Sequence, residues 1–182
     1  DASQGGEHVE LYGLGFVGLT LGVALASRGH LVSAVDTNQA LVHQLKHGVP
    51  HVFEPRLAEM LQQTLKDRQI SLGTAPPSEH HNVVIISVGT PIDEKGQASL
   101  EALSDVCAVV AARLRRGDLV MLRSTIPVGT TRGIVREELE NGSGLTAGID
   151  YNLAFTPERT VEGHAMQELS TLPQVVGGYS NA

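Results

Sequence analysis

The chain has 182 residues, 41% of them hydrophobic and 18% charged, so it can bury a core and is neither fibrous nor disordered. A net charge of -7 and an aromatic content of 3% disfavour a nucleic-acid partner, which clustered Lys and Arg or stacked aromatic rings would bind. The single cysteine, Cys107, excludes an internal disulfide and a thiolate zinc cage and favours a cytoplasmic location. No apolar run reaches the roughly 20 residues of a membrane span, so no membrane partner is expected. Residues 1 to 7 do not resemble a signal peptide and are expected to be a frayed or appended terminus.

Apolar runs of strand length alternate with segments of helical period along the chain, a pattern typical of a parallel sheet with crossover helices. The predicted strands are Val9 to Gly13, Leu31 to Asp36, Val83 to Val88, Leu119 to Arg123 and Leu153 to Thr156, with short ones near Ile70 and Val175. The predicted helices are Val17 to Ser27, Ala40 to His47, Leu57 to Arg68, Leu100 to Leu114 and Thr130 to Leu139. The order predicts an α/β fold: a Rossmann-type, doubly wound, mostly parallel sheet with helices on both faces.

Glycines and a Gly-rich loop mark the expected ends of several of these helices. Glycines close the first two predicted helices at Gly29 and Gly48, and Asn141-Gly142-Ser143-Gly144 is predicted to be a loop. There is no internal repeat and no low-complexity segment. A single domain over residues 1 to 182 is therefore expected.

A glycine-rich motif follows the first predicted strand directly and reads Gly13-Leu14-Gly15-Phe16-Val17-Gly18. Glycines at these spacings permit a tight turn, let backbone N–H groups approach a pyrophosphate, and let the helix pack closely on the strand. Asp36 ends the next strand 18 residues after Gly18, where a carboxylate accepts hydrogen bonds from a ribose 2′-OH and repels a 2′-phosphate. NAD is therefore predicted in preference to NADP. The simpler alternative is a glycine turn followed by a solvated aspartate.

Polar residues also follow three later strands. They are Gly89-Thr90-Pro91, Ser124-Thr125-Ile126-Pro127 and Pro157-Glu158. In open α/β sheets the ligand lies outside the carboxyl ends of the strands, so these residues are expected to converge on the dinucleotide. Each group taken alone would be an ordinary turn or cap.

Two glutamates near the end of the chain are four residues apart. If a helical turn follows Pro157, Glu158 and Glu162 share one face and could both point into the crevice, where one could act as a base. The alternative is a pair of solvated surface carboxylates. His43, His47 and His51 are also spaced by four, but Gly48 and Pro50 interrupt the helix, so a solvated face is predicted rather than a metal site.

Cys107 lies among apolar residues of a predicted helix and is expected to be a buried, inert thiol.

Together these motifs resemble the N-terminal domain of the UDP-glucose/GDP-mannose dehydrogenase family. The matching segments appear in the family's order and are Gly13 to Gly18, Val35-Asp36, His47-Gly48-Val49-Pro50 with Glu54-Pro55, Val88-Gly89-Thr90-Pro91, Ser124-Thr125-Ile126-Pro127-Val128-Gly129-Thr130-Thr131, and Pro157-Glu158-Arg159-Thr160-Val161-Glu162-Gly163. The family oxidises the C6 alcohol of a nucleotide-linked hexose to a carboxylate, passing two hydrides to two NAD+ through a cysteine-bound thioester that water hydrolyses.

The resemblance implies a role for each matched residue. Gly15 to Gly18 would hold the pyrophosphate, Asp36 the adenosine ribose, and Thr90-Pro91 the wall of the dinucleotide site. Thr125 would lie near the reacting carbon and the nicotinamide. Glu158 would activate water for thioester hydrolysis, and Glu162 would contact the nicotinamide side. Within the wider cofactor site, Gly89 and Ser124 flank these residues.

Some positions depart from the common family pattern. Leu41 stands where many members have Arg or Lys, which removes one phosphate contact. Arg56 and Arg159 replace the Gly of Glu-Pro-Gly-Leu and the Phe of Pro-Glu-Phe, and these changes resemble the UDP-N-acetylmannosamine dehydrogenase branch. UDP-glucose is the next substrate in order of preference.

The family's nucleophilic cysteine and catalytic lysine would lie in a part of the enzyme that follows these residues, as would the central domain that forms a homodimer. The resemblance therefore implies an NAD-binding part that is inactive alone. Two other functions remain open: a stand-alone dinucleotide-binding or redox-sensing module, and a two-domain dehydrogenase acting on a hydroxy acid.

Overall fold

The computed structural model describes residues 6–180, which form two compact units. Unit 1 comprises the chain up to Glu79 together with Arg159–Pro173. Unit 2 comprises His80–Glu158 together with the segment that starts at Gln174. The chain therefore passes from one unit to the other three times. Within the described residues, no helix has the length and apolar character needed to cross a membrane.

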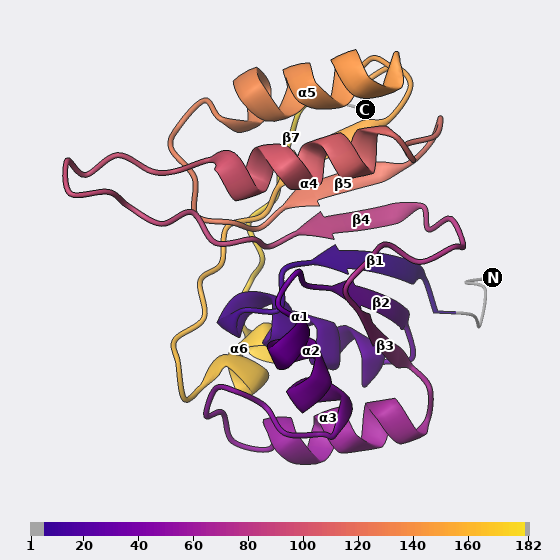
Figure 1. Cartoon of the computed structure of the whole chain (residues 1–182), viewed down its shortest axis with the longest axis vertical. Helices are drawn as coiled ribbons and strands as arrows, with labels where there is room; N and C mark the ends of the chain where they lie inside the picture. The colour runs from indigo at the N-terminus through magenta and orange to yellow at the C-terminus, as the bar shows by residue number, and fades with distance from the viewer. Residues whose placement is uncertain (1–5, 181–182) are drawn as a thin grey trace. The chain divides into compact units, whose positions relative to one another are not determined.

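Unit 1 contains three parallel strands in the order β3-β2-β1. Residue His8 is opposite Leu31, and Val32 is opposite Ile70. The strands are β1 (His8–Tyr12), β2 (Leu31–Val35) and β3 (Ile70–Gly73), and the helices are α1 (Phe16–Ala26), α2 (Gln39–Lys46), α3 (Leu57–Lys66) and α6 (Ala165–Thr171) (Figure 1).

The first two helices form where their sequence predicts them. Eight of the eleven residues of α1 are buried, which explains why the helix is apolar around nearly its whole circumference. The side chain of Asn38 caps α2 by accepting a hydrogen bond from the N–H of Leu41 at 3.1 Å. Gly29 and Gly48 follow the two helices with φ angles of +91° and +72°, a conformation that favours glycine.

The terminal residues predicted to be a frayed or appended segment fall partly outside the described range, because residues 1 to 5 are not described. Glu7 is attached to unit 1: its carbonyl accepts from the N–H of Leu31 at 3.0 Å, and its own N–H donates to Nδ1 of His30 at 3.1 Å.

Helix α6 returns to unit 1 from late in the sequence. Its first residue, Ala165, is fully buried, and Arg28 Nη2, just beyond α1, donates to Ser170 Oγ at 2.7 Å. In Figure 1, α6 accordingly lies beside α1. Sequence analysis predicted no helix here, because only seven residues are helical and most are polar.

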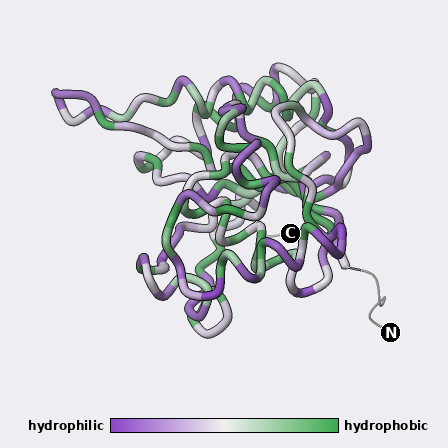
Figure 2. The backbone as a smooth tube through the Cα atoms, turned by 60° about the horizontal axis from the view of Figure 1, so that its bottom comes forward, coloured by the Kyte–Doolittle hydropathy of each residue, from purple (hydrophilic) through white to green (hydrophobic). Residues whose placement is uncertain are grey.

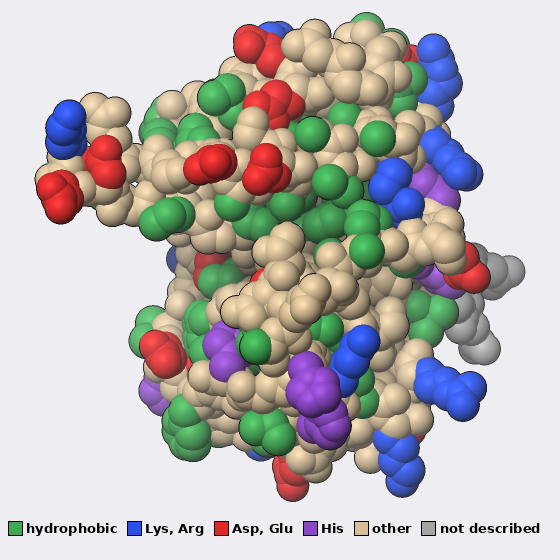
Figure 3. Space-filling model, viewed as in Figure 1, with side chains coloured by type: hydrophobic (Ala, Val, Ile, Leu, Met, Phe, Trp, Pro, Cys, Tyr) green, Lys and Arg blue, Asp and Glu red, His purple; other side chains and the backbone are tan. Residues whose placement is uncertain are grey.

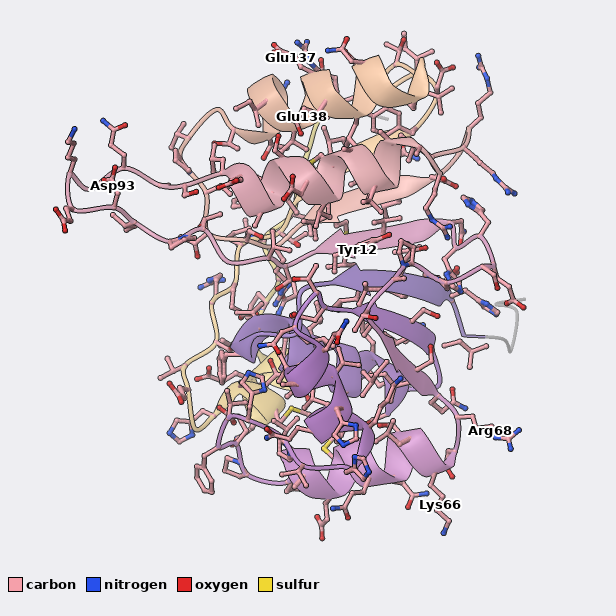
Figure 4. The ribbon with its side chains drawn as sticks, viewed as in Figure 1. Tyr12, Lys66, Arg68, Asp93, Glu137 and Glu138 are labelled. Carbon is pink, nitrogen blue, oxygen red and sulfur yellow. The ribbon has the colours of Figure 1, made fainter. Side chains whose placement is uncertain are left out.

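Unit 2 contains the strands β4 (Val83–Ile86), β5 (Leu119–Leu122) and β6 (Asn152–Phe155), which are parallel, and β7 (Gly177–Gly178), which pairs with β6 in the antiparallel direction. Helices α4 (Glu101–Ala111) and α5 (Arg136–Ser143) pack against each other. Ser104 of α4 donates to Glu138 of α5, which Figure 4 shows between the two helices.

Two details around α5 contradict the prediction of a helix from Thr130 to Leu139 followed by a loop. An irregular helical segment, η1 (Thr131–Val135), comes first, and Gly133 inside it leaves helical geometry. The helix then continues through Asn141 and Gly142 and ends at Gly144, which has a φ of +72°. A Cβ on Gly142 would lie 2.7 Å from Cβ of Ala111, so this glycine permits close packing of α5 on α4 rather than ending the helix.

A charged arm, residues 91–99, follows β4. It is a hairpin in which Ile92 pairs with Ala98, and the side chain of Asp93 accepts from the N–H groups of Lys95 and Gln97, both at 2.8 Å. The hydropathy colouring shows its hydrophilic tip, and the space-filling view shows the acidic and basic side chains there (Figures 2 and 3).

The strand orders β3-β2-β1 in unit 1 and β4-β5-β6 in unit 2 are those of the two halves of a Rossmann fold. The predicted doubly wound, mostly parallel α/β class is confirmed. The predicted strands occur within one or two residues of their expected positions.

Candidate functional site

The glycine turn lies between β1 and α1 in unit 1, as the motif predicts. Gly13 has a φ of +91°, which a residue with a side chain rarely adopts. A Cβ on Gly18 would lie 1.9 Å from the carbonyl oxygen of Gly13, so only glycine allows α1 to begin this close to the turn. A Cβ on Gly15, in contrast, would meet no atom within 4 Å. The three glycines therefore differ: Gly13 adopts a positive φ, Gly18 permits close packing, and Gly15 leaves open space.

The space over Gly15 is open. Gly15 is the residue before α1 and is exposed, whereas Leu14 is buried below it and Phe16 and Val17 begin the helix half-buried. The N–H groups in the first turn of a helix have no partner within the helix, and its dipole favours an anion there. These residues could hold a pyrophosphate on backbone N–H groups, with a glycine where a side chain would fill the space.

Asp36 follows β2 and contacts the glycine turn. Its Oδ2 accepts from the N–H of Leu14 at 2.8 Å, and its Oδ1 accepts from the N–H of Asn38 at 2.9 Å. Both carboxylate oxygens therefore have a fixed orientation, and the side chain is half-buried. The structure places the predicted ribose ligand in contact with the predicted phosphate-binding turn.

Glu162 lies in the part of unit 1 that precedes α6. Residues 157–161 are not helical, and the turn that leads into α6 begins at Glu162 itself. The condition for Glu158 and Glu162 to share one face, a helical turn after Pro157, is therefore not met. The physical reason is that Val161 N–H donates to Glu168 Oε2 at 2.7 Å and Gly163 N–H donates to Glu54 Oε1, so side chains rather than helical carbonyls accept these hydrogen bonds. The side chain of Glu162 is exposed.

In unit 2, hydrogen bonds join the ends of two neighbouring strands. Ser124 Oγ, just after β5, donates to the carbonyl of Val88 at 2.6 Å, and Thr90 Oγ1 donates to the carbonyl of Thr125. The two loops therefore hold each other through the residues that the sequence singled out. Gly89 and Pro91 are exposed on either side of Thr90, and Thr125 is exposed as well.

An ion pair that sequence reasoning missed holds Glu158. Both Nε and Nη2 of Arg123 approach Glu158 Oε2, at 3.0 and 2.9 Å, and the two side chains are only 6% and 11% exposed. Nη1 of Arg123 donates to Gln174 Oε1 at 3.3 Å. The carboxylate predicted to act on water is therefore held in one orientation by the residue that follows β5.

The available signal for Arg123 was its position. A strand of four apolar residues ends directly in an arginine, and a charge at the end of a buried strand calls for a partner. No local pattern pointed to Gln174.

The three histidines spaced by four residues and the single cysteine differ in their exposure to solvent. His43, His47 and His51 are exposed, and no cluster of three metal-ligating side chains occurs within residues 6–180. Cys107 is fully buried. Burial, and secondarily the carboxylate of Glu138, raises the pKa of this thiol from 9.0 to about 12, so it is a poor nucleophile.

A glycine turn that meets a helix N-terminus, with an acidic residue after the second strand, defines a dinucleotide-binding Rossmann domain. Residues 7–182 match the model of the UDP-glucose/GDP-mannose dehydrogenase family, NAD binding domain. The chain therefore belongs to this family, and its cofactor is NAD.

Similar proteins agree with this assignment. The chain is 34% identical over 178 residues to UDP-N-acetyl-D-mannosamine dehydrogenase of Pyrococcus horikoshii, and the match covers 94% of the chain and 41% of that protein. It is 32% identical over 176 residues to GDP-mannose 6-dehydrogenase of Pseudomonas putida, covering 93% of the chain and 40% of that protein. The chain thus spans about two-fifths of the length of these relatives.

Solved structures give the same result. A UDP-D-ManNAc dehydrogenase structure from Pyrococcus horikoshii superposes with a TM-score of 0.89 at 32% identity, over 96% of this chain and 41% of that one. A ternary complex of GDP-mannose dehydrogenase from Pseudomonas aeruginosa gives 0.86 at 28% identity, over 93% and 40%. A stand-alone redox-sensing module is not favoured, because the matched proteins are dehydrogenases.

Proposed function

We propose that the chain binds NAD for a nucleotide-sugar 6-dehydrogenase, which oxidises a UDP-hexose to the uronate with two NAD+. The observation that carries the proposal is the glycine turn, with Gly13 at positive φ, Gly18 against its carbonyl and Asp36 hydrogen-bonded to Leu14. The family match over residues 7–182 restricts this dinucleotide chemistry to nucleotide-sugar dehydrogenases.

In unit 1, the N–H groups of residues 15–18 would bind the pyrophosphate over the open face of Gly15, while the N–H of Leu14 stays bonded to Asp36. Asp36 would accept hydrogen bonds from the adenosine ribose on the lone pairs that the N–H groups of Leu14 and Asn38 leave free. Glu162 would contact the nicotinamide side. The bound NAD supplies the hydride acceptor.

In unit 2, the paired loops around Thr90 and Ser124 would supply a rigid wall for the cofactor, with Gly89 and Pro91. Thr125, fixed through its carbonyl by Thr90, would lie near the reacting carbon. Glu158 would orient and deprotonate the water that hydrolyses the thioester. Its ion pair with Arg123 supports this role by holding one carboxylate oxygen, which leaves the position of the other defined.

UDP-N-acetylmannosamine is the substrate that we favour, with UDP-glucose next. The support is the similarity to the Pyrococcus horikoshii enzyme and the two arginines, Arg56 and Arg159, at the positions that resemble this branch. The uronate product would serve polysaccharide biosynthesis. A cytoplasmic location is proposed because the single cysteine forms no internal disulfide, as is usual in a reducing compartment. The complete enzyme is proposed to be a homodimer.

The 182 residues alone are proposed to bind NAD without turning over substrate. Thioester formation needs an accessible thiolate, and the one cysteine of this chain is fully buried with a raised pKa. Calorimetry should therefore detect NAD binding, while absorbance should detect no NADH with either UDP-sugar. NADH formed by these residues and abolished in Cys107→Ala would refute this proposal. Failure of the full-length protein to oxidise either UDP-sugar would refute the assigned activity.

A further inference from the structure

Glu54 is a buried carboxylate for which the proposed chemistry has no use. It lies shortly before α3 and is 5% exposed. Its Oε1 accepts from the N–H of Gly163, which is 109 residues away in the sequence but belongs to the same unit. Its Oε2 is buried without a hydrogen-bond partner among the described residues. Burying a carboxylate oxygen without a donor costs free energy, so stability alone does not explain a glutamate here.

The contact falls on the segment that carries Glu162. The N–H of Val161, on one side of Glu162, donates to Glu168 of α6 at 2.7 Å. The N–H of Gly163, on the other side, donates to Glu54. Gly163 has a φ of +90°, which turns the chain sharply at this point. Two carboxylates thus fix the backbone on both sides of Glu162, while the side chain of Glu162 itself is exposed.

We propose that Glu54 is a positioning residue that holds Glu162 in place for the nicotinamide end of NAD. The proposal rests on the proposed function and deepens it, because it assigns a role to a residue that does not itself touch the cofactor.

The physical reason is preorganisation. A glutamate on an unrestrained turn loses backbone freedom when it binds a ligand, and this loss reduces the affinity. With the N–H of Gly163 already bonded, that cost falls on folding instead. Removal of the Glu54 contact should therefore weaken binding of the nicotinamide end of NAD, which Glu162 would contact. The contacts with the adenosine and the pyrophosphate should stay intact. The effect is that of one hydrogen bond, about threefold to tenfold in affinity.

Two substitutions separate the charge of Glu54 from its reach. Glu54→Asp keeps the charge but shortens the side chain by one methylene, so the contact with Gly163 is lost. Glu54→Gln removes the charge but keeps a carbonyl oxygen that can accept from Gly163. Glu59→Asp, at an exposed position of α3, is the matched control for shortening a glutamate. Urea unfolding of each variant checks that the domain is folded.

Calorimetry with NAD and with ADP-ribose, which lacks the nicotinamide, provides the decisive comparison. Glu54→Asp should bind NAD about threefold to tenfold more weakly and ADP-ribose within about twofold of the unmodified chain. Glu54→Gln and Glu59→Asp should bind both like the unmodified chain. In a Glu162→Ala background, Glu54→Asp should cause no additional loss of NAD affinity.

Three results would overturn the proposal: unchanged NAD affinity in Glu54→Asp, an equal loss for NAD and ADP-ribose, or an undiminished effect when Glu162 is absent. An unmodified chain that binds neither ligand would instead refute the proposed function, and this inference with it.

Discussion

Adding a single methyl group at Gly18 tests the geometry of the glycine turn directly. The new Cβ would lie 1.9 Å from the carbonyl oxygen and 3.0 Å from the carbonyl carbon of Gly13. Since comfortable contacts between such atoms are about 3.5 Å, the turn and α1 must separate by roughly 1.6 Å. The obstacle is backbone, so no side chain can rotate away. Gly18→Ala is expected to lower the free energy of unfolding by about 3 kcal/mol, or the melting temperature by about 6 to 12 °C.

Two neighbouring glycines are matched controls for this change. A Cβ on Gly15 meets nothing within 4 Å, and its φ of -62° suits alanine, so Gly15→Ala should change the free energy of unfolding by less than about 1 kcal/mol. The methyl group would occupy the space proposed for the pyrophosphate, and NAD affinity should fall at least about tenfold. Gly22, inside α1, has only ordinary contacts from 3.6 Å outward, so Gly22→Ala should stabilise by about 0.5 to 1 kcal/mol.

Urea unfolding and NAD calorimetry on the three variants complete the test. The expected pattern is a large loss of stability only in Gly18→Ala and a loss of NAD affinity without loss of stability only in Gly15→Ala. Unaltered stability in Gly18→Ala would refute the reasoning about close packing. Unaltered NAD affinity in a folded Gly15→Ala would refute the pyrophosphate site.

Three further expectations concern single side chains. Because Asp36 presents a carboxylate beside the glycine turn, NAD should bind more tightly than NADP by about 1 to 3 kcal/mol in calorimetry, and equal affinities would contradict its assignment. In the full-length protein, Glu158→Gln should spare the oxidation steps and accumulate a covalent acyl adduct detectable by mass spectrometry; wild-type turnover would remove Glu158 from the mechanism. Because burial raises the pKa of Cys107 from 9.0 to about 12, the unfolded chain loses this proton first, and stability should decrease as the pH rises through that range. Cys107→Ala should reduce this alkaline decrease in urea unfolding and leave NAD affinity unchanged; an identical alkaline decrease would argue against the buried thiol as its source.

Local patterns were sufficient for most of the fold. Strands with continuous apolar runs, and helices followed by glycine at positive φ such as Gly29 and Gly48, occur close to where they were predicted. At Gly142 the same rule failed, because a glycine that lets two helices approach and a glycine that ends a helix are identical in the sequence. Helix α6 was missed because burial of Ala165 and the bond from Arg28 stabilise it, and both depend on distant residues.

The same distinction applies to the site. The glycine motif and Asp36 are close in sequence and have a fixed spacing, so their contact could be predicted. The pair of Arg123 and Glu158 joins residues 35 positions apart, and that of Glu54 and Gly163 joins residues 109 positions apart. Both depend on which strand ends and loops the fold brings together. The contacts are observed, but the binding and catalytic roles of the site residues, those of Asp36 and Thr90 as well as those of Thr125, Glu158 and Glu162, remain predictions.

The threefold passage of the chain between the units determines which shorter versions of this protein can fold. A version that stops at Glu79 contains every strand of unit 1 but omits α6, so the surface that buries Ala165 would face water and Arg28 would lose Ser170. A version that stops at Glu158 also omits α6, takes away the N–H of Gly163 from which Glu54 Oε1 accepts, and removes β7 from the edge of β6. Cleavage of the peptide bond between Glu158 and Arg159, by contrast, removes no residue. The two fragments together can still form all of these contacts. Deletion is therefore expected to be far more damaging than cleavage at the same position.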